Sequence, residues 1–334
     1  MNKSFQFLNL PMKFILFGIM ISLNLISLMT SNLIHLWFLL EINLLIFLFL
    51  MTKTTKYFSL MPFFFFIQAI SSLMIIWIFN LNFFSMNYSV IEFIFFLSIS
   101  MKLGLFPFTW LPPIFFKYMN WNMIFLFSTL QKFIPFMIIK NFNFNCKFLF
   151  YICLYSIILS TFKAIFTENI KSIMAYSSIN NSAWMIIIIL IDTMMFQLYF
   201  LFYLILMFLM KNFFNQMNMS YMSDILIYEN SNMLMYFILM IFSLSMIPPF
   251  CSFIPKISGI LILIKMNMLM MTLILTICSI LSILMYLTIM IKLLLYFHLK
   301  YKIKYFLKTQ YNYISLFMIS FMFPTFWFMY YLLI

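Results

Sequence analysis

The chain contains 334 residues, of which 66% are hydrophobic and only 7% are charged, and its mean hydropathy is +1.13. A soluble domain is about half apolar, so this composition excludes an ordinary water-soluble protein. The formal net charge of +13 comes from lysine, because the chain has no arginine. Surplus lysine in a membrane protein marks the loops on the cytoplasmic or matrix side, so we expect a lipid bilayer and no nucleic acid as partner.

The composition also points to an organelle genome. The chain has only three glycines and one valine, whereas residues with A/T-rich codons such as Phe, Ile, Met, Asn and Lys are abundant. This bias is typical of an extremely A/T-rich genome, and organelle genomes typically encode hydrophobic membrane subunits. Residues 1–11 contain a lysine and lack a small-residue cleavage pattern, so we expect no cleavable signal peptide.

Apolar stretches of about 20 residues recur along almost the whole chain, and each can cross a hydrocarbon core of about 30 Å as a helix. Lipid offers no partner for an unpaired backbone group, so the crossings must be helical. We therefore predict an all-α polytopic membrane protein with about eleven transmembrane helices. The predicted spans are 13–30, 32–51, 59–80, 88–118, 121–140, 148–166, 170–190, 195–214, 233–266, 268–296 and 312–333.

Two of these spans, 88–118 and 233–266, are too long for one simple crossing and have prolines at their middles. A proline inside a helix removes a backbone hydrogen bond and clashes with the preceding turn, so both spans are predicted to be broken helices. The prolines at the breaks are Pro107 and Pro112 in the first span and Pro249 and Pro255 in the second.

The two broken helices indicate an internal repeat. Five predicted spans occupy each half of the chain, and an odd number of crossings per copy inverts the second copy in the membrane. We expect a first repeat over 1–140, a second, inverted repeat over 141–296, and a basic loop with a C-terminal helix over 297–334. With the N-terminus on the positive side, alternate loops hold thirteen lysines and the opposite loops three, in agreement with the positive-inside rule.

Four ionisable residues, Glu41, Lys102, Lys132 and Lys256, fall near the middle of the membrane in this arrangement. An ionised side chain at that depth is costly unless it has a partner, and it usually marks an ion or proton pathway. Burial disfavours a charged lysine and a nearby carboxylate stabilises it, so small movements change its proton occupancy. We expect a proton relay; the alternative is a set of structural ion pairs. The polar stretch 175–184 either lines a water path or packs helices together.

Redox cofactors and metal sites receive little support. In this topology His35 and His298 fall near opposite membrane faces, so they cannot hold one haem between them. The isolated glycines Gly18, Gly104 and Gly259 cannot form a dinucleotide or phosphate loop. The four cysteines lack the paired spacing of an iron–sulfur or zinc site. We expect no cofactor and no metal in this chain.

Five segments match the pattern of a known family in order and spacing. They are Trp37–Leu45 (WFLLEINLL), Lys102–Pro112 (KLGLFPFTWLP), Gln131–Lys132 followed by Pro135, Lys171–Trp184, and Ser243–Lys256 (SLSMIPPFCSFIPK). On these residues the chain resembles the subunit 2 family of mitochondrial NADH:ubiquinone oxidoreductase, respiratory complex I, whose members are antiporter-like membrane subunits.

This resemblance implies that Glu41, Lys102, Lys132 and Lys256 are proton-translocating residues. It implies a subunit of a proton-translocating NADH:ubiquinone reductase without a redox centre of its own, because flavin and iron–sulfur clusters belong to partner subunits. Its partners would be the other membrane subunits of complex I, and protons would be the transported species. The location would be the mitochondrial inner membrane, with the N-terminus on the matrix side and the C-terminus on the intermembrane-space side.

Two other functions stay open on the sequence. One is a stand-alone cation/proton antiporter of the related type, and the other is a purely structural subunit that seals and assembles a membrane complex. The codon bias favours the complex I interpretation over the antiporter. A structural role predicts that neutralising the central lysines leaves turnover and pumping intact.

Overall fold

The regular elements of this chain are helices. A computed structural model describes residues 9–54, 60–81, 88–142, 147–217, 241–245, 253–265, 267 and 269–301, and each element bounded within these ranges is an α-helix. In chain order they are α2 (Asn9–Met29), α3 (Leu33–Thr54), α4 (Leu60–Leu81), α5 (Tyr88–Leu103), α6 (Leu111–Tyr118), α7 (Trp121–Ser128), α8 (Leu130–Asn141), α9 (Lys147–Ile165), α10 (Ile170–Ile189), α11 (Thr193–Met217), α13 (Phe253–Lys265) and α14 (Leu269–Tyr301).

Within the described ranges, eight helical stretches are long and apolar enough to cross a membrane. Large apolar side chains stay exposed on their outer faces, among them Phe38, Phe66 and Leu273, each about 60% exposed. Lipid can cover such faces at no cost, whereas water cannot. The predicted all-α, multi-pass fold is therefore confirmed. The count of eleven crossings stays a prediction, because the span 312–333 and much of 233–266 lie outside the described residues.

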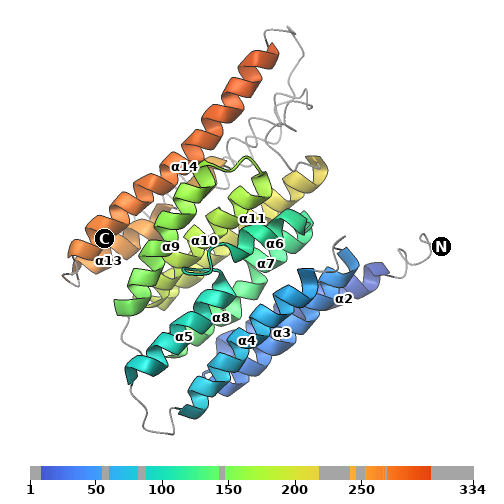
Figure 1. Ribbon diagram of the computed structural model, residues 1–334, viewed down its shortest axis with the longest axis vertical. Coiled ribbons are helices and arrows are strands. Elements are labelled where there is room, and N and C mark those ends of the chain that lie inside the picture. Colours follow the sequence, from blue (N-terminus) through green and yellow to red (C-terminus); the bar gives the residue numbers. More distant parts are fainter. Residues whose placement is uncertain are drawn as a thin grey trace. The chain divides into compact units, whose positions relative to one another are not determined.

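The chain divides into two units, Met1–Ile152 and Cys153–Ile334. In the first unit α2, α3 and α4 lie side by side, α3 packing between the other two (Figure 1). Helix α5 packs against both α4 and α8, and α8 packs back against α3 and α2. Helices α3, α4, α5 and α8 therefore form a closed ring of neighbours. The predicted boundaries at residues 140 and 296 stay predictions.

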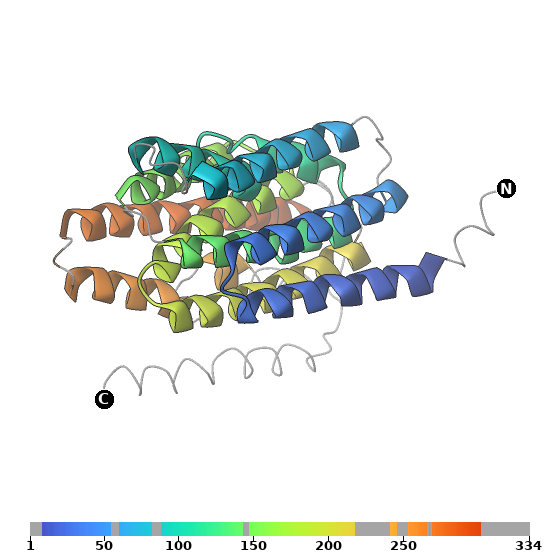
Figure 2. The same cartoon turned by 90° about the horizontal axis from the view of Figure 1, so that it is seen from below.

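In the second unit, α10 packs against α11 and α13, and α13 also packs against α14 (Figure 2). A carbon placed as Cβ on Gly259 of α13 would come 3.3 Å from the side chain of Ile188 on α10. The missing side chain at Gly259 therefore lets α13 and α10 approach closely, as small residues do between membrane helices.

The first predicted helix break is present and has a clear local cause. Helix α5 ends at Leu103, and Gly104 follows with φ +72°, the left-handed conformation that caps many helices. The N–H of Leu105 donates to the carbonyl of Ser100 at 3.0 Å, which closes the cap. Helix α6 then begins with Pro112 in its first turn, where a missing N–H costs nothing.

Two further prolines of the predicted breaks, Pro107 and Pro255, lie within the described residues. Pro107 lies between α5 and α6, and its peptide bond with Phe106 is cis. Pro255 lies in the first turn of α13. Pro249 falls within 246–252, outside the described residues.

A second break in the first unit was not predicted. The span 121–140 consists of two helices, α7 and α8, which meet at Thr129 with φ −115° and ψ −78°. The hydroxyl of Thr129 donates to the Phe125 carbonyl at 2.6 Å, and its N–H donates to the same oxygen at 3.1 Å. Side-chain bonding of this kind competes with the helical ladder. Pro135 removes one further backbone donor from α8.

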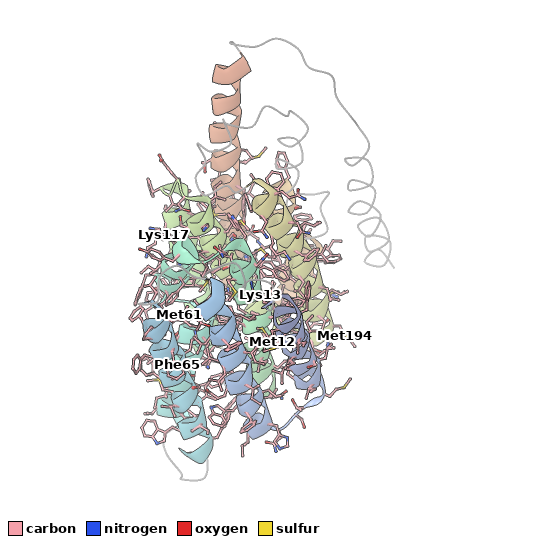
Figure 3. The ribbon with its side chains drawn as sticks, turned by 90° about the vertical axis from the view of Figure 1, so that its right-hand side faces the viewer. Met12, Lys13, Met61, Phe65, Lys117 and Met194 are labelled. Carbon is pink, nitrogen blue, oxygen red and sulfur yellow. The ribbon has the colours of Figure 1, made fainter. Side chains whose placement is uncertain are left out.

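Two exposed lysines lie toward one end of the first unit. Figure 3 shows Lys13, near the start of α2, and Lys117, near the end of α6, toward the same end of the helices. Both side chains are exposed. This end is the one to which the lysine distribution assigns the positive side of the membrane.

The cap at Gly104 yields a first testable prediction. A Cβ at this position would lie 2.8 Å from Cδ of Pro112 and closer still to its Cγ, and the backbone would be strained by the positive φ. We expect Gly104→Ala to lower the free energy of unfolding by about 2 kcal/mol or more. Thermal unfolding of the purified assembly measures the change.

Gly18→Ala is the matched control. Nothing lies within 4 Å of a Cβ at Gly18, which sits inside α2. Alanine is the better helix former, so the control is expected to be neutral or stabilising by up to about 1 kcal/mol. Equal losses in the two variants would show that the Gly104 cap has no special role.

Candidate functional site: buried ionisable residues beside two helix breaks

The first unit brings three of the four predicted site residues onto neighbouring helices. Glu41 is on α3, Lys102 on α5 and Lys132 on α8, and both α3 and α5 pack against α8. Lys102 is 6% exposed and Lys132 is 2% exposed. Oε1 of Glu41 is buried and accepts no hydrogen bond from a described residue. Three ionisable side chains are thus placed in one apolar helix bundle.

Lys102 lies at the carboxyl end of a helix. It is the last residue but one of α5, so its ammonium lies beside the negative end of the helix macrodipole. Its Nζ donates to the carbonyl oxygen of Gln68 on α4 at 3.5 Å, a long hydrogen bond. Glu41 interacts electrostatically with it. The break after α5 therefore supplies negative potential at a buried cation.

Lys132 lies in the first turn of α8, directly after the break at Thr129. Its backbone N–H donates to the Thr129 carbonyl at 3.1 Å. Helices α2, α3, α5 and α7 all pack against α8, which leaves its side chain buried. Both lysines of this unit are therefore placed within one helical turn of an interruption, Lys102 before it and Lys132 after it.

Amide side chains from two helices converge on the turn that carries Lys132. Nδ2 of Asn24 on α2 and Nδ2 of Asn43 on α3 both donate to the carbonyl oxygen of Leu130, at 3.2 and 3.3 Å. Nε2 of Gln131 on α8 donates in the opposite direction, to the carbonyl oxygen of Asn43 at 2.9 Å. Amide side chains thus join α2 and α3 to the first turn of α8.

The second unit contains the fourth predicted residue, Lys256. It lies in the first turn of α13, is 5% exposed, and its Nζ is 4.8 Å from the ring centroid of Trp184 on α10. This is within cation–π range, and the interaction gains strength where water is excluded. An aromatic face is therefore the described neighbour of this ammonium.

The polar stretch of α10 combines two kinds of side chain. The hydroxyls of Ser177, Ser178 and Ser182 donate to carbonyls three residues earlier in their own helix. Oδ1 of Asn181 instead accepts from Tyr199 on α11 at 3.3 Å. Oδ1 of Asn180, Nδ2 of Asn181 and Nε1 of Trp184 are buried without a hydrogen-bond partner among the described residues. The serines thus bond to carbonyls of their own helix, and Asn181 also joins α10 to α11.

Several residues of these sites were not predicted from the sequence. The break at Thr129 had one available signal, the pairing of Ser128 and Thr129 six residues before Pro135. Asn24 could have been noticed as an amide inside an apolar span. The placement of Trp184 over Lys256 had no sequence signal, because it depends on how two distant helices pack. Among the described residues, no group of three His, Cys, Asp or Glu side chains could hold a metal ion.

Similar proteins are known. The chain is 29% identical over 245 residues to NADH-ubiquinone oxidoreductase chain 2 of Anopheles gambiae, covering 70% of this chain and 71% of that one. It is 30% identical over 196 residues to the protein of the same name from Mus musculus, covering 57% of this chain and 56% of that one.

Two solved structures have the same fold. A chain of respiratory complex I from Thermus thermophilus matches with a TM-score of 0.70 at 16% identity, covering 79% of this chain and 66% of that one. A chain of the Mrp complex from Dietzia sp. DQ12-45-1b matches with a TM-score of 0.63 at 15% identity, covering 79% and 57% respectively. This chain therefore spans about two thirds or less of either solved chain.

A family model for the transmembrane part of NADH:quinone oxidoreductase and Mrp antiporter subunits matches residues 15–282, which is most of the chain and includes all four ionisable positions. The chain belongs to the NADH:quinone oxidoreductase/Mrp antiporter transmembrane family.

Proposed function

We propose that this chain is the antiporter-like subunit 2 of respiratory complex I in the mitochondrial inner membrane. In this role it couples electron transfer from NADH to ubiquinone, carried out in other subunits, to proton translocation through Glu41, Lys102, Lys132 and Lys256. The flavin and iron–sulfur clusters belong to those other subunits, and the neighbouring membrane subunits are its partners. Its relatives named NADH-ubiquinone oxidoreductase chain 2 support this assignment.

The observation that carries the proposal is the placement of three ionisable side chains in one bundle beside two helix breaks, with Lys102 and Lys132 buried and Glu41 half-buried. An unbroken helix exposes no free backbone groups to the interior of the bundle. An interrupted helix frees backbone carbonyls, which can bind water or a cation. Lys102 and Lys132 flank such interruptions, and Glu41 supplies the opposite charge. A structural ion pair would need no helix breaks.

The proposed architecture is eleven crossings in two inverted five-helix repeats with one C-terminal helix. Lys102 and Lys256 support it, because each lies near prolines in its own half of the chain, Lys102 before the break at Pro107 and Lys256 directly after Pro255 in the first turn of α13. The N-terminus is proposed to face the matrix and the C-terminus the intermembrane space. The exposed Lys13 and Lys117, at one end of the first unit, favour that orientation.

A stand-alone cation/proton antiporter is the second candidate, because the Mrp complex chain has the same fold. Affinity capture of the chain from native membranes distinguishes the two. We expect it to copurify with a large flavin-containing assembly that reduces quinone with NADH and moves protons into vesicles. Isolation without such an assembly, together with NADH-independent cation/proton exchange, would replace complex I by the antiporter.

The relay yields a prediction for its lysines. Lys102→Met and Lys256→Met keep most of the side-chain volume and remove the exchangeable proton. We expect proton transfer through this chain to slow by about 100-fold or more in either variant. This factor is the lower end of what a positioned general acid or base contributes to a rate. The proton yield per NADH in vesicles, measured beside NADH:quinone turnover, gives the result.

Matched controls exist in both units. Lys265 is an exposed lysine on α13, the helix that also carries Lys256. Lys117 is an exposed lysine on α6, the helix that follows the one carrying Lys102. Lys117→Met and Lys265→Met are expected to keep the normal proton yield. If the buried variants also keep full NADH oxidation with a normal yield, the relay is wrong and a structural role replaces it.

The ring that faces Lys256 gives a further prediction. Trp184→Leu removes a cation–π contact of about 0.5–2 kcal/mol, which corresponds to a change of about 2- to 30-fold in the proton equilibrium at Lys256. We expect the pH profile of proton uptake to shift, while Trp77→Leu, at a 55% exposed position of α4, leaves it unchanged. Identical profiles for Trp184→Leu and the unaltered chain would remove Trp184 from the site.

A further inference from the structure

The helices that carry Glu41 and Lys132 are joined by a reciprocal pair of hydrogen bonds. The side chain of Asn43 donates to the backbone of Leu130, and the side chain of Gln131 donates to the backbone of Asn43. Each bond therefore joins one helix's side chain to the other's main chain. Asn24 adds a second side-chain donor to the same Leu130 oxygen, so α2 is tied to this turn as well.

This arrangement fixes the relative position of α3 and α8 along their axes. A slip of one residue moves a side chain by about 1.5 Å along the helix and turns it by about 100°. Either movement breaks both bonds of the reciprocal pair. Glu41 lies two residues before Asn43, and Lys132 follows Gln131 directly. The pair therefore sets how far the carboxylate and the ammonium lie from each other.

The amides are a poor choice if they only fill space. Oδ1 of Asn24 and Oδ1 of Asn43 are buried, and neither has a hydrogen-bond partner among the described residues. Asn43 is 1% exposed. An unsatisfied buried acceptor destabilises a fold, and leucine, which has the same branching as asparagine, would avoid that cost. The directional hydrogen bonds are what leucine could not supply.

We propose that Asn24, Asn43 and Gln131 form an amide clamp that holds the Glu41 helix in register with the Lys132 helix at the break between α7 and α8. The three amides are positioning residues, because they act through the placement of Glu41 and Lys132. The clamp deepens the proposed proton relay and rests on it.

Asn43→Leu and Gln131→Met test the clamp in the assembled complex. A misplacement of about 1 Å at a reacting group can slow a reaction by up to about 100-fold. We expect both variants to assemble in normal amounts, to lower the proton yield per NADH, and to shift the pH profile of proton uptake. A purely structural contact would change the amount of assembly without moving that pH profile.

Asn141→Leu is the matched control. Asn141 is also on α8, and its Nδ2 donates to the carbonyls of Thr30 and Ser31 at 3.3 Å each, so it ties α8 to the segment between α2 and α3. It lies ten residues from Gln131, which is about 15 Å along the helix. We expect Asn141→Leu to keep the yield and pH profile of the unaltered chain. An equal loss in this control would overturn the clamp.

A distance measurement separates failure of the clamp from failure of the relay. Spin labels at Leu45→Cys on α3 and Lys140→Cys on α8, both exposed positions, report the separation of the two helices in a chain whose Cys146 and Cys251 are replaced by serine. We expect Asn43→Leu with Gln131→Met to shift or broaden the distances. A normal proton yield in Lys102→Met would show that the relay is wrong. An unchanged distance distribution in the Asn43→Leu, Gln131→Met variant would show, independently of the relay, that the clamp is wrong.

Discussion

The constraint on which this structure depends is that a membrane interior supplies no hydrogen-bond partner to an interrupted backbone. The chain nevertheless interrupts two helices in its first unit, and each interruption has its own local solution. At Gly104 the left-handed cap lets Leu105 bond back to Ser100. At Thr129 the hydroxyl donates to the Phe125 carbonyl, and amides from α2 and α3 donate to the Leu130 carbonyl in the following turn. Polar side chains are therefore concentrated where the helices break, and so are the buried lysines.

The first unit and the second unit treat a buried lysine differently. Lys102 has a carboxylate as its electrostatic partner and a carbonyl oxygen from α4, whereas Lys256 lies against the face of an indole ring. A carboxylate can itself take up a proton, but an indole ring cannot. In the proposed relay the two environments would suit different steps, since the first can exchange a proton with its partner and the second can only hold or release one.

The sequence predicted the features that follow from local chemistry and left open those that depend on packing. Long apolar stretches predicted the helices, and Pro107 and Pro112 predicted the first break, because a proline acts on its own turn. The break at Thr129 escaped the same reasoning, since it lies within an apolar stretch and depends on amides from α2 and α3. Glu41, Lys102 and Lys132 were chosen by their depth in the predicted spans and by the family resemblance. Their placement on neighbouring helices required the structure.

The position of Lys102 has an electrical consequence. Helix α5 has 16 residues and rises about 24 Å, which is less than the hydrocarbon core of about 30 Å, so a helix of this length that begins at one membrane surface ends with Lys102 inside the insulating layer. A proton that reaches Lys102 from either surface has crossed part of the membrane voltage. Crossing the whole of it is worth about 2.3 kcal/mol per 100 mV for one elementary charge. In the proposed relay, the proton occupancy of Lys102 therefore responds to membrane voltage even when both surfaces have the same pH, so the voltage that pumping builds would act back on the relay.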